Sequence, residues 1–329
     1  MHFLIRFILQ KLLHLLLLLL SVAVLTFVLV SLSPVDTVNA YVGSDVIRLG
    51  SEQRELIIQR WGLDKPWIMR FILWLGQLLQ GNLGTSMTYN QPVSDVIAER
   101  FQASLWLMAL AWLGSGILGV ALGVLAGAKE ASLLDQAIRL YAYTLSSAPT
   151  FWIALLLLIT FSVTLKVTPM CCATPPGVLL KDVTFWQRLY HLLLPALALS
   201  VIGVANIALQ TREKLIQVLN SNYALFAYAQ GETTTGVILH HGLRNIALPA
   251  LTLQFASLSE LFGGTVLIEK VFGYPGLGSA TLQAGLRNDV PLLVGIVLFS
   301  AIFVFIGNTL ADLSYQVIDP RIRIAGTRG

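Results

Sequence analysis

The chain has 329 residues, of which 56% are hydrophobic and only 12% are charged. Soluble domains carry about 25% charged residues, so this composition excludes a soluble enzyme, and disorder requires the opposite balance of low hydrophobicity and high net charge. The net charge is +4, but the 21 basic residues are scattered and form no patch for nucleic acid. The composition therefore predicts a protein embedded in a membrane.

Six segments are apolar enough to cross a bilayer, which takes about 20 residues. The first is longer than the apolar core of a signal peptide, so we expect an uncleaved span, although Val38-Asn39-Ala40 would pass as a cleavage site. The predicted spans are Leu12–Leu32, Ala103–Ala128, Leu140–Leu165, Leu189–Leu209, Ile246–Ile268 and Val290–Ala311. They predict an all-α polytopic protein with an N-terminal segment and first span over 1–32, an external helical loop over 33–102 and a five-span core over 103–329.

The distribution of basic residues predicts the orientation. Six spans place both termini on one side. Ten Lys and Arg residues lie in the N-terminal segment, the loops after the second and fourth spans and the C-terminal tail, against five in the two short loops of the other side. Because cytoplasmic loops are enriched in Lys and Arg, we expect both termini in the cytoplasm.

The long loop over 33–102 is expected to form two helices. Ser51 with Glu52 and Glu55 predicts a helix start and Gly62 its end, and a second helix should begin near Pro66. Its apolar residues recur at helical spacing: Trp67, Ile68, Phe71, Ile72, Leu75, Leu78 and Leu79. Two interpretations remain open, an external cap that docks a partner and an amphipathic helix that lies on the bilayer.

Several kinds of chemistry are missing from the sequence. Gly231 and Gly236 have the spacing of a phosphate-binding loop, but Val237 stands where the lysine that reaches the phosphates is needed, so nucleotide binding is not expected. The neighbours His240 and His241 point to different faces of a helix and are not expected to share a metal. Cys171 and Cys172 are adjacent, and neighbouring cysteines rarely form a structural disulfide. With Met170 they are weak candidates for a soft-metal contact; the alternative is two small loop residues.

Three regions carry the candidate function. Residues 210–245 make a longer connection than two neighbouring spans need, and they predict two short cytoplasmic helices, Tyr223–Gln230 and Thr233–Leu243, separated at Gly231, with Pro249 opening the next span. Such a segment can fit a cleft of another protein; the alternative is an ordinary loop.

The second region is Glu260, the one acid well inside a span, where ionisable groups usually face a bundle interior or a water-filled path. With Ser257, Gly263 and Gly264 it predicts a translocation path, and the alternative is a hydrogen bond between helices. The third region is Glu269-Lys-Val-Phe-Gly-Tyr-Pro-Gly-Leu-Gly278, which predicts a rigid external turn acting as a gate or docking loop. Its candidate residues are Glu269, Phe272, Tyr274, Pro275, Gly276 and Gly278.

Over nearly its whole length the sequence resembles the inner-membrane permeases of the dipeptide, oligopeptide and nickel branch of ATP-binding-cassette importers. The order and spacing of the matching pieces carry the resemblance. They are Gly62-Leu-Asp-Lys-Pro66, Gly81-Asn-Leu-Gly84, Gln91-Pro-Val93, Ala148-Pro149-Thr-Phe151, Thr211-Arg212, Ala227, Ala229 and Gly231, His241-Gly-Leu-Arg-Asn245, Leu248-Pro249, Glu269 to Gly278, Asp312-Leu-Ser-Tyr315 and Asp319-Pro-Arg-Ile-Arg323.

The resemblance implies that the chain has the permease core of a type I ATP-binding-cassette importer. It also implies that the chain lies in a cell inner membrane, with the 33–102 loop in the periplasm. It implies that 210–245 is the coupling loop that inserts into an ATPase subunit, with the candidate residues Tyr223, Ala227, Ala229, Gly231, Glu232, His241, Arg244, Asn245 and Pro249. Family members usually carry basic residues between the small ones. Here the stretch reads Phe226-Ala-Tyr-Ala-Gln230, so the charged part of the contact is missing.

The resemblance also implies the partners and the energy source. They are a second, related permease chain, two ATP-binding subunits and a periplasmic substrate-binding protein, alongside membrane lipid. The chain itself is expected to be non-catalytic and to bind no cofactor, with ATP and magnesium held by the ATPase. Nickel or a metal chelate is slightly preferred as the substrate because of the two cysteines, and short peptides are the alternative. An ion-driven secondary transporter would need inverted repeats or several intramembrane charges, and a membrane-embedded enzyme would need clustered His, Asp or Glu.

Overall fold

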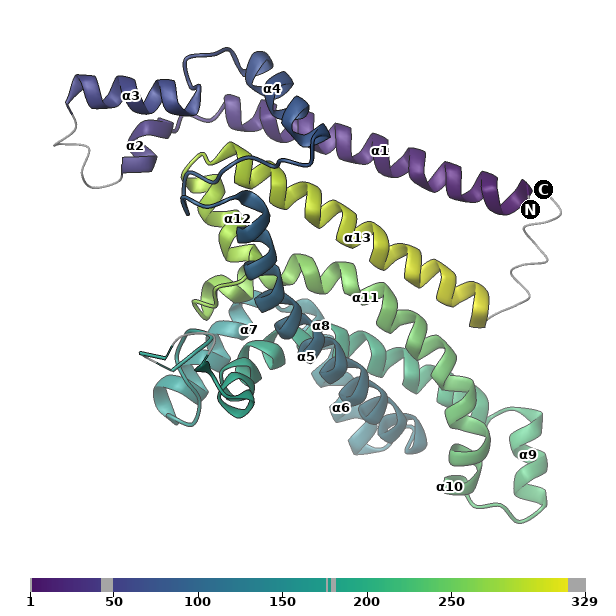
Figure 1. Ribbon diagram of the computed structural model, residues 1–329. Helices are drawn as coiled ribbons and strands as arrows, with labels where there is room; N and C mark the ends of the chain where they lie inside the picture. Colours follow the sequence, from purple (N-terminus) through teal and green to yellow (C-terminus); the bar gives the residue numbers. More distant parts are fainter. Residues whose placement is uncertain (1, 43–49, 176, 179–181, 319–329) are drawn as a thin grey trace. The chain divides into compact units, whose positions relative to one another are not determined.

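The computed structural model describes residues 2–42, 50–175, 177–178 and 182–318, without the side chains of 2–8, 202, 244, 248 and 311–318. Within these ranges all regular structure is helical, apart from one isolated bridge between Thr85 and Pro92 (Figure 1). The predicted all-α class is confirmed.

The helices follow one another along the chain, with the longest connection between η2 and α8. They are α1 (His2–Ser31), α2 (Thr37–Val42), α3 (Ser51–Trp61), α4 (Trp67–Leu79), α5 (Val93–Ala128), α6 (Leu133–Ser147), α7 (Thr150–Leu157), α8 (Phe185–Leu219), α9 (Asn222–Ala229), α10 (Thr234–Val237), α11 (Leu243–Val271), α12 (Leu277–Leu286) and α13 (Val290–Ile318), with two π-helical turns, η2 (Leu158–Thr164) and η4 (Ile238–Gly242).

Four of these helices are long and apolar enough to cross a membrane alone, over Leu9–Ser31, Val93–Ala128, Asn245–Val271 and Val290–Leu310. Two bent pairs, Leu133–Ser147 with Thr150–Thr164 and Phe185–Val201 with Gly203–Leu219, bring the total to six if each pair is one span. The helix of the second predicted span, α5, begins at Val93 and not at Ala103, because the polar residues before the apolar run continue the same helix.

The predicted third span is not one continuous helix. α6 and the helix after it are bent by 112°. The break lies at Pro149, and Ala148 before it has the extended conformation φ −86°, ψ 138°. A proline disfavours the helical conformation of the residue that precedes it, so the helix ends at Ser147 and a new one starts after Pro149.

The contacts divide the chain into two compact units, Met1–Ser104 with Pro275–Phe305 and Leu105–Tyr274 with Ile306–Gly329. In the first unit α4 lies beside α1 (Figure 1). A buried cluster joins them to α13, and its members are Ala23, Phe27, Trp74, Val290, Val294 and Leu298. The predicted helix boundaries here are confirmed, since α3 ends at Gly62 in the left-handed conformation (φ 62°) and α4 follows Pro66.

The buried carboxylate of Asp289 ties the loop before α5 to the start of α13. It accepts hydrogen bonds from the Ser86 hydroxyl at 2.7 Å and the Thr88 backbone N–H at 2.8 Å. Its other oxygen accepts from the backbone N–H of Leu292 at 3.3 Å, in the manner of a helix N-cap. The fully buried carboxylate of Asp289 therefore accepts hydrogen bonds from both of these segments.

In the second unit α5 packs against α8 along three glycines spaced four residues apart. A Cβ atom added to Gly119 would lie 2.7 Å from the Cβ of Ile207, and one added to Gly127 would lie 3.1 Å from the Arg212 carbonyl oxygen. At Gly123 it would lie 2.5 Å from the Cβ of Thr211 and 2.6 Å from the Ala208 carbonyl oxygen. Small residues at this spacing allow two helix backbones to approach closely in a membrane, where burial of apolar surface gives no driving force.

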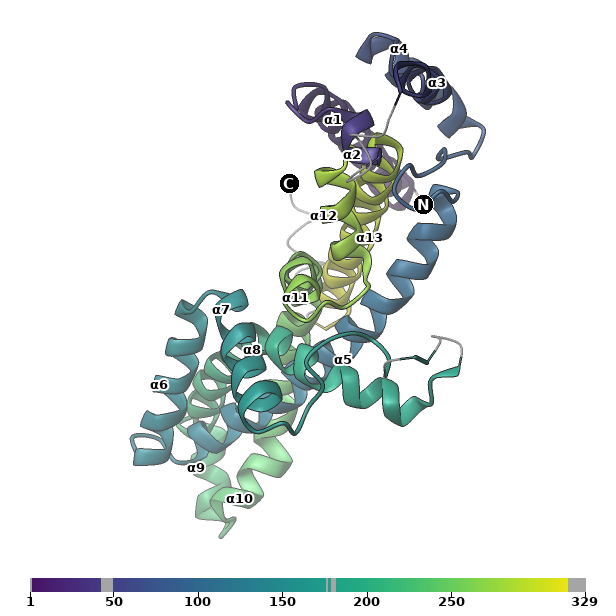
Figure 2. The ribbon, with the colours of Figure 1, turned by 90° about the vertical axis from the view of Figure 1, so that its left-hand side faces the viewer.

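An ion pair joins α6 to α8 in the same unit. The fully buried Asp135 carboxylate accepts from Nε of Arg212 at 2.5 Å and from its Nη2 at 2.7 Å, and the Ala131 backbone N–H donates to it at 3.0 Å. Figure 2 shows α6, α7 and α8 together. Nε of Arg139 on α6 lies 3.6 Å from the same carboxylate, so cations from both helices compensate this buried charge.

We predict that Gly123→Ala destabilises the protein by about 1–3 kcal/mol, the usual cost of overpacking, because the new methyl group would meet backbone of α8. Gly114→Ala in the same helix is the matched control, since its Cβ would lie 4.0 Å from the nearest atom, the Cβ of Ser200. The measurement is the melting temperature of the purified protein in detergent. Equal melting temperatures for the two variants would contradict the close contact.

Candidate coupling and translocation site

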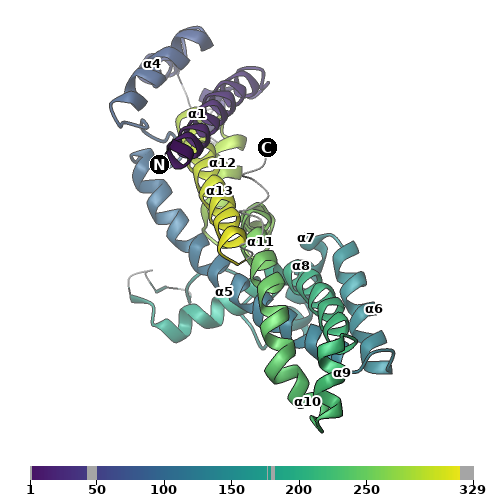
Figure 3. The ribbon, with the colours of Figure 1, turned by 90° about the vertical axis from the view of Figure 1, so that its right-hand side faces the viewer.

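The first predicted short helix of the 210–245 connection is present as α9, whereas the second, predicted over Thr233–Leu243, is the single turn α10 followed by the π-helical turn η4. We call residues 222–237, which comprise α9, α10 and the turn between them, the coupling segment. The hydroxyls of Ser221 and Thr233 cap the two helices, accepting from the N–H groups of Ala224 at 3.4 Å and Gly236 at 3.2 Å. Gly231 has φ 90° and makes the turn, as expected of the residue type that adopts this conformation without strain. Figure 3 shows the segment at one end of α11.

Small buried residues hold the two helices of the coupling segment together. Ala224, Ala227 and Val237 form a buried cluster. The outer surface is apolar: Leu225 is 59% exposed and Phe226 64% exposed, with Tyr223 beside them at 44%. Of the predicted small contact residues, Ala229 and Gly231 are at the surface and Ala227 is inside. The segment therefore displays large apolar side chains where a water-facing loop would display polar ones.

Polar contacts fix the coupling segment to the helix that follows it. The carboxylate of Glu232 lies 3.7 Å from Nε2 of His241 and 3.9 Å from Nδ1 of His240. The Asn245 side-chain amide donates to the His241 carbonyl at 2.8 Å and to the Tyr223 hydroxyl at 3.4 Å. The two hydrogen bonds of Asn245 and the approach of Glu232 to His241 bring four of the predicted coupling residues close together.

The structure changes three details of this region. The two neighbouring histidines, which were expected to point to different faces of a helix, lie on the π-helical turn η4 and both approach the carboxylate of Glu232. Pro249 lies inside α11 and does not open it. The side chain of Arg244 is outside the described part of the chain. No group of three His, Cys, Asp or Glu residues able to hold a metal occurs within the described residues.

Three of the four predicted path residues lie together. Ser257, Glu260 and Gly264 line a cavity of about 20 Å³ between α11 and α8. Ser257 donates to the Gln254 carbonyl at 2.8 Å, and a Cβ on Gly264 would lie 2.9 Å from Leu199. The Glu260 side chain is exposed, and no described residue pairs with its carboxylate. Gly263 does not line this cavity and faces open space.

The turn after α11 is buried by its neighbours and is not exposed at the protein surface. Glu269, Phe272 and Tyr274 are at most 3% exposed, and the Tyr274 N–H donates to the Glu269 carbonyl at 2.8 Å. Gly273 makes the turn with φ 57°. Burial and the neighbouring Glu269 raise the pKa of the Tyr274 hydroxyl above its ordinary value. This part of the predicted loop is a rigid turn, with its aromatic side chains in the core.

The rest of the predicted loop belongs to the first unit. Arg100 donates to the Pro275 carbonyl at 3.2 Å, and the Ser104 hydroxyl accepts from the Leu277 N–H at 2.7 Å. Gly276 caps α12, and Gly278 is buried in its first turn. Arg100 and Ser104 were not among the predicted site residues, although a basic residue and a hydroxyl at the start of an apolar span are a recognisable signal.

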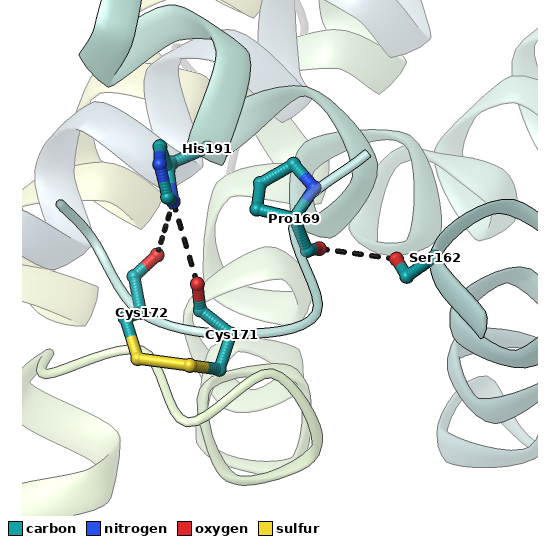
Figure 4. The surroundings of a disulfide bond; sticks show 5 residues. All are labelled: Ser162, Pro169, Cys171, Cys172 and His191. Atoms are coloured by element: carbon teal, nitrogen blue, oxygen red, sulfur yellow. Dashed lines mark hydrogen bonds between the residues drawn. A yellow bond between two sulfur atoms is a disulfide. The ribbon is translucent and has the colours of Figure 1, made fainter. Parts of the chain in front are cut away.

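The expectation that Cys171 and Cys172 do not pair is wrong, because they form a disulfide (Figure 4). Cys172 has φ 75°, and both cysteine carbonyls point to Nδ1 of His191, at 3.3 Å and 3.2 Å. The Cys172 N–H donates to the Phe272 carbonyl at 3.0 Å, which fastens this loop to the end of α11. Metal binding requires thiolates, so the bonded pair does not offer the predicted soft-metal contact.

We predict that the protein purified without reductant takes up no alkylating agent after denaturation, because a disulfide sulfur has no thiolate to react. After reduction, both cysteines should react. Intact-mass spectrometry reads the number of added groups, and Cys172→Ser, which leaves one thiol, should take up one group without reduction. Alkylation of both cysteines in the unreduced protein would contradict the disulfide.

The comparisons with known proteins identify the family. Residues 119–324 match the family described as binding-protein-dependent transport system inner membrane component, and residues 4–108 match the N-terminal family of the same membrane components. No strand interrupts the helices within the described parts of either match.

Three relatives cover almost the whole chain. A provisionally named peptide permease of Brucella suis biovar 1 is 38% identical over 97% of this chain and 99% of its own. The dipeptide transport system permease protein DppB of Escherichia coli (strain K12) is 33% identical over 92% and 94% of the two chains. The oligopeptide transport system permease protein AppB of Bacillus subtilis (strain 168) is 31% identical over 92% and 95%. The chain therefore belongs to the family of inner-membrane components of binding-protein-dependent transport systems, the permease subunits of ATP-binding-cassette importers.

Proposed function

We propose that this chain is a permease subunit of an importer for short peptides. The observation that carries the proposal is the match along nearly the full length to permeases named for dipeptides and oligopeptides. This favours the alternative of the sequence analysis over its slight preference for nickel. The cysteines on which that preference depended are bonded to each other.

The energy for transport comes from partner subunits in this proposal. Gly231 and its neighbours lack the lysine that a phosphate-binding loop needs, so ATP and magnesium are bound by two ATPase subunits. A second, related permease chain completes the membrane part, and a periplasmic binding protein delivers the peptide to the outer face. Both termini then lie in the cytoplasm, as the distribution of basic residues predicts.

The coupling segment is the contact with an ATPase subunit. Its exposed Leu225 and Phe226 supply an apolar surface, and the contacts around Glu232 hold the segment against α11. Movement of the ATPase can then be transmitted to a membrane-spanning helix. The coupling segment lacks the basic residues that family members usually carry there. We therefore expect the groove of the ATPase subunit that receives it to be apolar as well.

Alternating access follows from two states of the bundle. ATP draws the ATPase subunits together and opens the path outward, and hydrolysis returns it to the inward state. Coupling between the sites is reciprocal, so a delivered peptide must favour closure of the ATPase. The exposed carboxylate of Glu260 and the small residues beside it supply the lining of the path.

We expect a strain that lacks this chain to lose uptake of a radiolabelled dipeptide and to keep uptake of radioactive nickel. Cells with the intact operon are compared with the deletion strain, and with the deletion strain carrying a plasmid copy. Loss of nickel uptake alone would overturn the peptide assignment. Loss of neither would overturn both substrates and leave the family membership unaffected.

We predict that Glu260→Gln lowers the rate of dipeptide uptake about tenfold, the effect of one lost charge-assisted contact of about 1.4 kcal/mol. The substitution keeps the shape of the side chain, and no described residue loses a partner. Glu52→Gln, an exposed carboxylate on α3 outside the spans, is the control. Unchanged uptake by Glu260→Gln at a normal level of protein in the membrane would exclude Glu260 from the path.

A further inference from the structure

The first unit contains a cavity of about 440 Å³ whose charged lining residues are all basic. Arg60 and Lys65 come from the end of α3 and the turn after it, and Arg70 comes from α4. No Asp or Glu lines the cavity, and none of the three cations forms an ion pair with a described residue. By contrast Arg54, on the same external loop, is paired with Asp36 at 2.5 Å.

Three residues of the lining also carry a side-chain nitrogen that is covered by neighbouring atoms. Nε of Arg70 and the indole nitrogens of Trp61 and Trp74 are buried and have no hydrogen-bond partner within the described residues. Burial lowers the pKa of the Arg70 guanidinium, and no neighbouring carboxylate offsets this effect. Three cations and no carboxylate line the cavity, so its chemistry fits a ligand with a negative charge.

A second, apolar groove of about 820 Å³ lies in the same unit between α1, α4, α5 and α13. Its lining includes Leu16, Leu20 and Ala23 of α1 and Leu78 of α4, and Ser94 is the one hydroxyl side chain among its lining residues. Trp74 lines both the cationic cavity and the apolar groove. The two spaces therefore adjoin at one side chain.

The depth of the two spaces along α1 fits one leaflet of a bilayer. Phe27, near the end of the span, lines the cationic cavity, and Leu16 lines the far part of the apolar groove. At a rise of 1.5 Å per residue, this part of the helix is about 16 Å long, and one leaflet is half of a hydrocarbon core about 30 Å thick. A water-soluble anion has no apolar part that could occupy the groove.

We propose that the two spaces together bind one anionic glycerophospholipid of the outer leaflet. The phosphodiester lies among Arg60, Lys65 and Arg70, as lipid headgroups do in basic pockets beside transmembrane helices, and an acyl chain lies in the groove. The lipid then holds α4 against α1. A choline headgroup carries a positive charge into a pocket of three cations, so a phosphatidylglycerol should bind better than a phosphatidylcholine with the same chains.

The test is native mass spectrometry of the full-length protein, purified with its partners in detergent and titrated with dioctanoyl phosphatidylglycerol, dioctanoyl phosphatidylcholine or glycerol 3-phosphate. We expect the phosphatidylglycerol to bind about tenfold more tightly than either of the other two. Arg70→Gln combined with Lys65→Gln should abolish this preference, and Arg54→Gln, which removes a cation already paired, should retain it. The mass of the assembled complex in the same spectra shows that each variant is folded.

A second variant tests the groove separately. Ala98 lines the groove and is exposed, so Ala98→Phe should fill it and weaken binding of the phosphatidylglycerol about tenfold. Equal binding of the two lipids, an equal loss in Arg54→Gln, or no loss in Ala98→Phe would overturn the proposal. Glycerol 3-phosphate binding as tightly as the phosphatidylglycerol would also overturn it, since the site would then serve a free anion. None of these measurements depends on transport activity.

Discussion

The second unit depends on the close approach of α5 and α8 at Gly119, Gly123 and Gly127. In a membrane two apolar helices gain nothing by leaving lipid, so they associate through close packing and polar contacts. At Gly123 even one methyl group would meet the backbone of α8. The ion pair of Asp135 with Arg212 then adds α6 to this pair, and Leu199 against Gly264 brings α8 to α11. α8 is thus in contact with three other helices through glycines or buried charge.

The two ends of α8 carry different features of the candidate site. Its first half carries His191, which holds the carbonyls of the disulfide loop. Its last residue, Leu219, packs against the cluster that builds the coupling segment. A displacement of that segment therefore reaches a helix whose position is fixed by packing and not by flexible loops. This is what transmission of movement from an ATPase requires, because packed interfaces transmit strain.

Span length and apolar periodicity predicted the helices well, because span length follows from the thickness of the bilayer and the periodicity follows from the helical repeat. The break at Pro149 was not predicted, since a proline inside a span is often accommodated by neighbouring groups. The disulfide was not predicted because its conformation, with Cys172 at φ 75°, cannot be read from spacing. The glycine spacing of α5 was visible in the sequence but was overlooked. Within the site, the coupling segment followed from the length of the 210–245 connection and the break at Gly231, whereas the burial of Phe272 and Tyr274 depends on tertiary packing.

The central claim is that an apolar coupling segment links this permease to an ATPase. The most direct measurement is ATP hydrolysis and dipeptide uptake by the purified transporter in proteoliposomes with peptide-loaded binding protein. Phe226→Ala is compared with Phe185→Ala, whose side chain is similarly exposed (64% and 62%) but lies at the far end of α8. The account predicts that only Phe226→Ala loses the stimulation of ATP hydrolysis by loaded binding protein, together with uptake. Full stimulation and uptake with Phe226→Ala would contradict it.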